Sequence, residues 1–229
     1  MKLQVNLNMM RRCSLLFEFL FCINHLARLN AVSVHNWSSK FNNNPSKNWV
    51  VLVAGTNTWR NYRHQADVFH AYQIVRKNNV PAENIITFAY DDIANKPRNP
   101  FKGKVFHDYL YEDIYQGVEI DYRGKDVTRD NFVKVLKGDE KLAANKKKVL
   151  KRISLPIICF TILRIFDGDL YDPLSAVYVT TSAKETEQSW SIFCDDTDID
   201  VCLASEYAYA WIGDSEYVSI SKKPLQISP

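Results

Sequence analysis

The stretch from Trp49 to Tyr90 constrains the fold of this chain more than any other part of the sequence. The run Trp49–Gly55 is continuously apolar and rich in β-branched residues, as is typical of a strand covered on both faces. From His64 to Asn78, apolar residues recur at helical spacing, and Asn84–Tyr90 has the pattern of a second strand. A strand, a helix and a strand within about forty residues form a βαβ unit, which predicts a parallel sheet.

The rest of the chain supplies further elements of the same kinds. Ile157–Thr161 and Ala176–Thr181 have strand patterns, whereas Asp130–Leu136 and Leu203–Trp211 have helical ones. A length of 229 residues and a net charge of +3 fit one ordinary globular domain and indicate no particular partner. The lysine-rich segment Lys134–Arg152 has no interleaved aromatic residues, which favours a solvated face over nucleic-acid binding.

The amino-terminal region has the pattern of a secretory signal. Two arginines precede an apolar stretch at residues 13–27, and small residues follow it, so we expect residues 1–33 to be a signal peptide. The alternative is a buried amphipathic helix. Residues 34–47 are polar and predict a linker, in which Asn36 begins an Asn-Trp-Ser glycosylation acceptor.

Secretion would place the remaining cysteines in an oxidising compartment. Cys194 and Cys202 flank a polar, acidic stretch that can reverse the chain, and this spacing predicts a small-loop disulfide. Cys159 would then stay free. The apolar stretch Ile153–Phe166 is too short to cross a bilayer core of ~30 Å, and it contains a proline and an arginine, so we do not expect a transmembrane protein.

Polar residues crowd the end of the first predicted strand. Asn61, Arg63 and His64 lie where functional groups gather in parallel sheets, beyond the carboxyl ends of the strands. One interpretation is structural, with Asn61 capping a helix and the other two side chains merely exposed. The other is functional, because a guanidinium fork and an imidazole suit the binding of an amide or carboxylate side chain.

The sequence resembles a known family over most of its length. The matching stretches are Asn48–Leu150, which contains NYRHQAD, YDD and YQGVEIDYRGKDVT, and Leu174–Ser215, which contains YVTTSAKETEQSW. They resemble the legumain family (peptidase C13), asparaginyl endopeptidases with a caspase-like α/β fold, and within it the haemoglobinase-type members of blood flukes. The resemblance implies a mostly parallel central sheet between helices and protein or peptide substrates containing asparagine. It also implies cystatin-like inhibitors, no cofactor or metal, and a secretory, lysosome-like, vacuolar or gut location.

The resemblance assigns roles to individual positions. Asn61 matches the residue that orients the catalytic histidine, and Arg63 and His64 match residues of the S1 pocket for asparagine. The substrate-lining loop of the family maps to residues 188–190, which makes Ser189 a pocket hydroxyl and Trp190 a neighbouring contact. We therefore expect Arg63, His64, Ser189 and Trp190 to bind substrate, beside Asn61 in its orienting role.

The sequence also departs from the family's pattern. Ser205 stands where the family has an acidic pocket residue, which should weaken recognition of a carboxamide nitrogen. Residues 162–164 are Ile-Leu-Arg where Asp-His-Gly is expected, and the Glu-Ala-Cys stretch with the nucleophile occurs nowhere. Cys159 lies in an apolar run typical of an inert thiol. His70 has the position of a packed core residue, and His107 has no partner that the sequence identifies.

The sequence thus predicts a caspase-like domain at residues 48–215 followed by a tail at 216–229. Without a histidine–cysteine dyad we expect this shortened chain to be catalytically inactive. We expect a sheet with fewer than the family's six principal strands, and poor order at residues 152–173. The alternatives are a non-catalytic pseudo-protease or binding module, a relative of the glycolipid-anchor transamidase, and a product that cannot complete its sheet.

Overall fold

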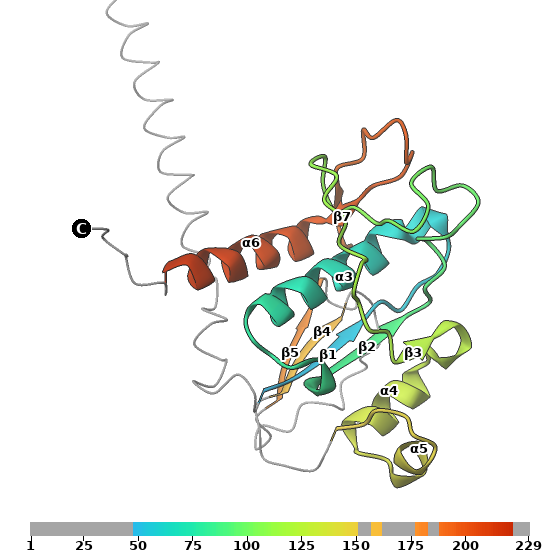
Figure 1. Cartoon of the computed structure of the whole chain (residues 1–229), viewed down its shortest axis with the longest axis vertical. Helices are drawn as coiled ribbons and strands as arrows, with labels where there is room; N and C mark the ends of the chain where they lie inside the picture. Colours follow the sequence, from blue (N-terminus) through green and yellow to red (C-terminus); the bar gives the residue numbers. More distant parts are fainter. Residues whose placement is uncertain (1–47, 151–156, 162–176, 183–187, 222–229) are drawn as a thin grey trace, which may run out of the picture. The chain divides into compact units, whose positions relative to one another are not determined.

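The computed structural model describes residues 48–150, 157–161, 177–182 and 188–221. Figure 1 shows a parallel sheet with α3 and α6 on one face and α4 on the other. The strands are β1 (Trp49–Val53), β2 (Ile85–Ala89), β3 (Tyr122–Arg123), β4 (Ile157–Thr161), β5 (Val177–Thr181), β6 (Ser191–Ile192) and β7 (Ala204–Ser205). The helices are η2 (Trp59–Asn61), α3 (Tyr62–Lys77), η3 (Ala82–Asn84), η4 (Gly124–Asp126), α4 (Arg129–Leu136), α5 (Glu140–Ala144) and α6 (Glu206–Ser221).

The main sheet has the strand order β3-β2-β1-β4-β5, and every neighbouring pair in it is parallel. At its centre, Val51 pairs with Ile86 of β2 on one side and with Cys159 of β4 on the other. The predicted α/β class with a parallel sheet is therefore confirmed. Among the described residues the main sheet has five strands, and the stretch that contains Cys159 lies inside it rather than at an edge.

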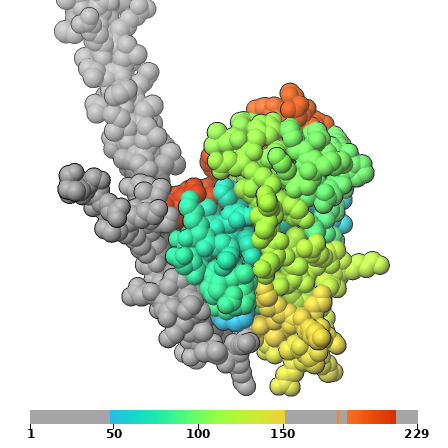
Figure 2. All heavy atoms as spheres, in the orientation of Figure 1, coloured from blue at the N-terminus to red at the C-terminus, as the bar shows by residue number. Residues whose placement is uncertain are grey.

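A long loop between β2 and β3, residues 90–121, covers α3. Figure 2 shows this loop, in green, spread over the viewed face beside the blue-green residues of the helix. The Gln73 amide on α3 donates to the carbonyl oxygens of Ile114 (3.1 Å) and Gln116 (3.0 Å). The amide N–H of Phe106 donates to the buried Tyr62 hydroxyl (2.7 Å). The loop is therefore fixed to the helix that carries the predicted site.

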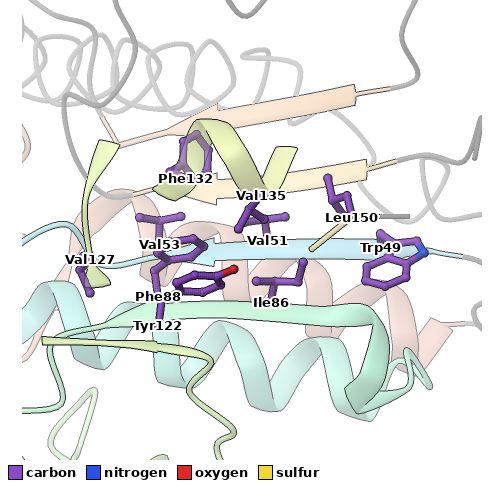
Figure 3. Packing of buried hydrophobic residues seen from close by; sticks show 10 residues of the cluster. All are labelled: Trp49, Val51, Val53, Ile86, Phe88, Tyr122, Val127, Phe132, Val135 and Leu150. Atoms are coloured by element: carbon purple, nitrogen blue, oxygen red, sulfur yellow. The ribbon is translucent and has the colours of Figure 1, made fainter. Parts of the chain in front are cut away.

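Side chains that alternate along the strands form two cores. Alternate residues of a strand point to opposite faces, so Trp49, Val51 and Val53 lie on the same face of β1. Figure 3 shows this face packed against α4, where Phe132 and Val135 contribute to one buried cluster. The cluster comprises Trp49, Val51, Val53, Ile86, Phe88, Tyr122, Val127, Phe132, Val135 and Leu150. The intervening, fully buried side chains of β1 face α3, which packs against β1 and β2.

The lysine run at residues 146–148 contributes to this packing. The Lys148 ammonium group donates to the carbonyl oxygen of Ile85 (2.8 Å) and pairs with Asp121 (3.0 Å). Lys147 pairs with Asp126 (2.6 Å). Two of the three lysines thus bind groups within the domain, near the ends of β2 and β3.

Several predictions concern residues that lie outside the described ranges. These are the signal peptide at 1–33, the linker at 34–47 with Asn36, and the order of residues 152–173 except for β4. The helix predicted to start at Leu203 begins at Glu206 instead, and it runs to Ser221, across the boundary placed at residue 215. In the part of the chain with assigned structure, no helix has the length and apolar character needed to cross a membrane.

Candidate substrate-binding site

Gln65 joins the ends of two neighbouring strands. Its side-chain amide donates to Asp92 (2.7 Å), and its carbonyl oxygen accepts from the amide N–H of Asp91 (2.8 Å). Asp92 also accepts from the amide N–H of Thr58 (2.9 Å) in the segment that leads into α3. The polar stretches that follow β1 and β2 are therefore held together, as expected for the carboxyl ends of adjacent parallel strands.

Asn61 occupies the residue before α3, but its side chain makes no capping hydrogen bond. Instead its amide donates back to the carbonyl oxygen of Asn57 (3.0 Å). The structural interpretation of Asn61 as a helix cap is therefore wrong. The orienting role that the resemblance implies for Asn61 remains a prediction.

Within the described part of the chain, three predicted site residues carry buried polar atoms that have no hydrogen-bond partner. These atoms are Nε of Arg63, Nδ1 of His64 and Oγ of Ser189. We refer to these three side chains as the binding set. Buried polar groups are nearly always hydrogen-bonded in folded proteins, and a group left unpaired costs about 1–3 kcal/mol. Among the described residues the buried Oγ1 atoms of Thr56 and Thr87 are unpaired as well, so such atoms are not confined to the predicted site, and a ligand role for the binding set remains a prediction.

The hairpin that carries Ser189 is attached to α3. β6 pairs with β7 in an antiparallel arrangement, with Ser191 opposite Ser205. The amide N–H of Glu206 donates to the carbonyl oxygen of Trp190 (3.1 Å), one residue after Ser189. Ser205 in turn bonds to α3 through Asp67, one helical turn after Arg63. These contacts bring the two sequence segments of the binding set to the same end of the molecule.

The electrostatic environment gives the two basic groups of the binding set, Arg63 and His64, different charge states. Burial lowers the pKa of the Arg63 guanidinium, and the nearby Asp67 carboxylate opposes this shift. Burial and the positive charge of Arg63 lower the pKa of His64 to about 4, again against the effect of Asp67. Arg63 therefore supplies a fixed cation, whereas His64 is neutral at mildly acidic and neutral pH, with one donor and one acceptor nitrogen.

Sequence reasoning missed a buried polar network behind the binding set. Nε2 of His107 lies 2.7 Å from a fully buried oxygen of Asp67, and Nδ1 of the same ring lies 3.0 Å from Nδ1 of His70. Ser205 was expected to be a weak pocket acceptor, but its hydroxyl donates to Asp67 (2.5 Å). No spacing in the sequence signals this network, because His107 lies 40 residues from Asp67 and Ser205 lies 138 residues from it.

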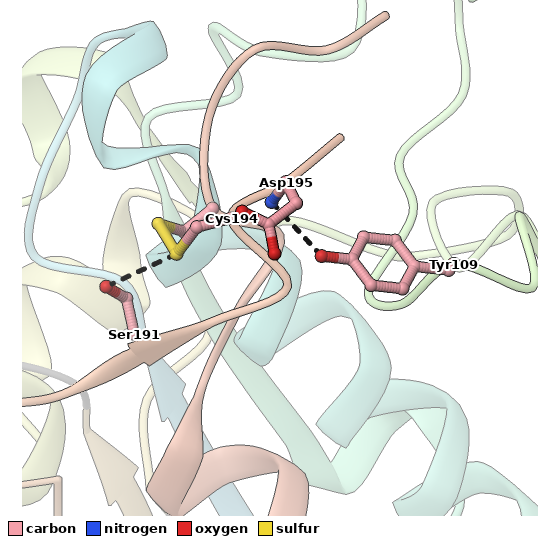
Figure 4. Close-up of a disulfide and its surroundings, with 5 residues drawn as sticks. Tyr109, Ser191, Cys194 and Asp195 are labelled. Carbon is pink, nitrogen blue, oxygen red and sulfur yellow. Dashed lines mark hydrogen bonds between the residues drawn. A yellow bond between two sulfur atoms is a disulfide. The ribbon is translucent and has the colours of Figure 1, made fainter. Parts of the chain in front are cut away.

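The chain beyond β6 forms a loop closed by a disulfide between Cys194 and Cys202. Figure 4 shows that the amide N–H of Asp195 donates to the Tyr109 hydroxyl (3.1 Å), which joins this loop to the β2–β3 loop. The Tyr109 ring packs on Phe193 with 5.0 Å between centroids. At the start of the same hairpin, the Trp190 side chain is 68% exposed. It therefore offers an apolar surface directly beside Ser189.

Comparison with known proteins decides the family. The sequence profile of the peptidase C13 family matches residues 48–155 and 166–228. This chain belongs to the peptidase C13 family. It is 38% identical to a haemoglobinase of Schistosoma japonicum, over 92% of the chain and 59% of that protein. It is 35% identical to legumain of Rattus norvegicus, over 78% of the chain and 52% of that protein.

A plant member of the C13 family is similar as well. The chain is 32% identical to the vacuolar-processing enzyme delta-isozyme of Arabidopsis thaliana, over 78% of the chain and 50% of that protein. It thus spans between half and three-fifths of the length of these curated relatives. The two matched ranges of the C13 profile leave out residues 156–165, which contain β4. The predicted membership of the legumain-type peptidases is confirmed, and the unmatched residues coincide with the junction at which the sequence departs from the family.

Proposed function

We propose that this C13 chain binds asparagine-containing peptides through Arg63, His64 and Ser189 and does not hydrolyse them. The observation that carries the proposal is the set of three buried polar atoms on these side chains that have no hydrogen-bond partner among the residues with assigned structure. A bound side chain that supplied their missing partners would recover interactions left unmade in the free protein. Peptide recognition is the role that best accounts for polar groups left unpaired in this way.

The binding set is complementary to a carboxamide. The Arg63 guanidinium can only donate, so it suits the carboxamide oxygen. The carboxamide NH₂ needs acceptors, which neutral His64 and the Ser189 hydroxyl can supply. An aspartate side chain has no hydrogen to donate to those two acceptors, and an alanine side chain fills none of the three positions. The donor and acceptor pattern therefore favours asparagine.

The proposed lack of hydrolysis rests on residues that are missing from the sequence. Hydrolysis by a cysteine peptidase needs a thiolate beside an imidazole that a third group orients. The 229 residues contain no Asp-His-Gly and no Glu-Ala-Cys stretch. We infer that the chain acts as a pseudo-protease on protein or peptide ligands in a secretory, lysosome-like or vacuolar compartment, where cystatin-like inhibitors are candidate partners.

Substitution of Arg63 tests the proposal. Arg63→Ala should weaken binding of an asparagine-containing peptide by about 10- to 100-fold, because a hydrogen bond to a charged group contributes about 1.5–3 kcal/mol. Calorimetric titration of wild type and variant measures the change. Arg60→Ala is the matched control, since Arg60 is exposed and lies three residues earlier. Equal binding of the asparagine peptide and its Asn→Ala counterpart by the wild-type protein would refute the proposed specificity.

A further inference from the structure

We propose that Asp67 is a positioning residue for the binding set, which it aligns by holding the β6–β7 hairpin against α3. This inference rests on the proposed peptide-binding function and adds a residue that does not itself touch the ligand. Asp67 lies on α3, four residues after Arg63, and its side chain is completely buried. Its role therefore depends on what its carboxylate binds inside the protein.

The carboxylate accepts three hydrogen bonds from two separate segments. One oxygen accepts from the amide N–H of Ser205 (3.0 Å) and lies 2.7 Å from Nε2 of His107. The other oxygen accepts from the Ser205 hydroxyl (2.5 Å). Because an ionised carboxylate can only accept, the His107 Nε2 atom must carry a proton. Asp67 thus ties both β7 and the β2–β3 loop to α3.

These bonds determine where Ser189 lies relative to Arg63. Ser205 is in β7, which pairs with β6, and the next residue, Glu206, bonds to the carbonyl oxygen of Trp190. Ser189 directly precedes Trp190, whereas Arg63 lies on the helix that carries Asp67. A shift of β7 on α3 would therefore change the spacing between the hydroxyl and the guanidinium of the binding set. Binding sites commonly lose their geometry when the residues that support the ligand-contacting side chains are replaced.

His107 is held from its other side. Its Nδ1 lies 3.0 Å from Nδ1 of the half-buried His70, so one of the two nitrogens donates to the other. The two rings also pack edge to face, with 4.8 Å between centroids. This second contact fixes the orientation of the His107 ring, and with it the direction of its bond to Asp67. A continuous series of contacts therefore runs from His70 through His107 and Asp67 to Ser205.

Two substitutions at Asp67 distinguish the effect of its hydrogen-bond geometry from the effect of its negative charge. Asp67→Ala leaves three buried donors without an acceptor, so the asparagine peptide should bind about tenfold or more weakly. Asp67→Asn keeps the geometry, because its oxygen can accept both N–H groups and its NH₂ can donate to the Ser205 oxygen. It should therefore bind within about threefold of wild type. An Asp67→Asn variant as weak as Asp67→Ala would overturn the positioning role.

A control variant distinguishes the positioning role of Asp67 from a general effect on protein stability. Tyr122→Phe removes the hydrogen bond from the Tyr122 hydroxyl to the carbonyl oxygen of Lys148 (2.8 Å), on the sheet face opposite α3. It should lower the melting temperature without changing the peptide affinity. If Asp67→Ala does not fold, Ser205→Ala replaces it and should weaken binding about three- to tenfold through the loss of one hydrogen bond. Unchanged affinity in whichever alanine variant folds would contradict the inference.

Hydrogen exchange supplies a readout that needs no peptide. The amide of Ser205 should exchange at least about tenfold faster in Asp67→Ala than in wild type, and at a near wild-type rate in Asp67→Asn. Unchanged protection of this amide in Asp67→Ala would refute the anchoring of β7. If the wild-type protein binds no asparagine peptide, the proposed function fails, but the exchange rates still decide whether Asp67 holds the hairpin.

Discussion

Replacement of Phe132 by alanine should lower the free energy of unfolding by about 3–5 kcal/mol, the usual cost of deleting a fully buried phenylalanine side chain. Phe132 is completely buried, and its ring packs edge to face on Phe88 of β2, with 6.0 Å between centroids. The Phe88 ring stacks on Tyr122 of β3 at 4.2 Å. The substitution therefore opens a cavity between α4 and the sheet.

Urea denaturation followed by circular dichroism measures this effect. Val133→Ala is the matched control, because Val133 neighbours Phe132 on the same helix but is only partly buried, and its truncation should cost about 1 kcal/mol or less. A clear difference between the two variants would show that the sheet and α4 form a cooperative core. Equal effects, or a wild-type protein without a cooperative transition, would support a chain that cannot complete its sheet.

Acidification should destabilise the protein through the buried His64 and the half-buried His70. Burial lowers the pKa of His64 to about 4, and Arg63 adds to the shift. Burial lowers the pKa of His70 to about 3, with further contributions from His107 and Lys77. Between an unfolded-state pKa of about 6.5 and these values, the unfolded chain binds more protons than the folded one, so stability falls as the pH falls.

The expected size of this effect is about 2 kcal/mol for each histidine between pH 7 and pH 4.5. Asp121 acts in the opposite direction, because burial raises its pKa and the folded protein takes up that proton more readily. Thermal melts over this pH range measure the net slope. His70→Asn should make the slope shallower, whereas Tyr122→Phe should leave it unchanged. A stability that rises on acidification would contradict the assignment of both histidines as neutral in the folded protein.

The elements that could be predicted are those with strong local patterns. The apolar runs of β1, β2, β4 and β5 and the helical spacing of α3 each determine a local structure by themselves, so their positions were predicted to within a few residues. The two-residue strands β3, β6 and β7 are too short to show a period. They form because neighbouring segments are already in place, which no local pattern reveals.

The candidate site likewise contains some residues that the sequence could predict and others that it could not. Arg63 and His64 could be proposed because they follow a strand and match a family motif. In the described ranges both carry buried atoms without a hydrogen-bond partner. Asp67 looked like one more polar residue of a helix, and its role depends on partners from two distant segments. Ser205 shows the same limit, because a serine in sequence gives no sign that its hydroxyl donates to a buried carboxylate.

We propose that this C13 chain binds asparagine-containing peptides and, without Asp-His-Gly and Glu-Ala-Cys stretches, does not hydrolyse them. Incubation of the purified protein with an asparagine-containing peptide at about pH 5.5, followed by calorimetry and mass spectrometry, tests both parts in one experiment. We expect saturable binding that Arg63→Ala weakens, and a peptide that is recovered intact. Cleavage after asparagine that disappears in a Cys159→Ala variant would contradict the proposed inactivity and would make that thiol the nucleophile.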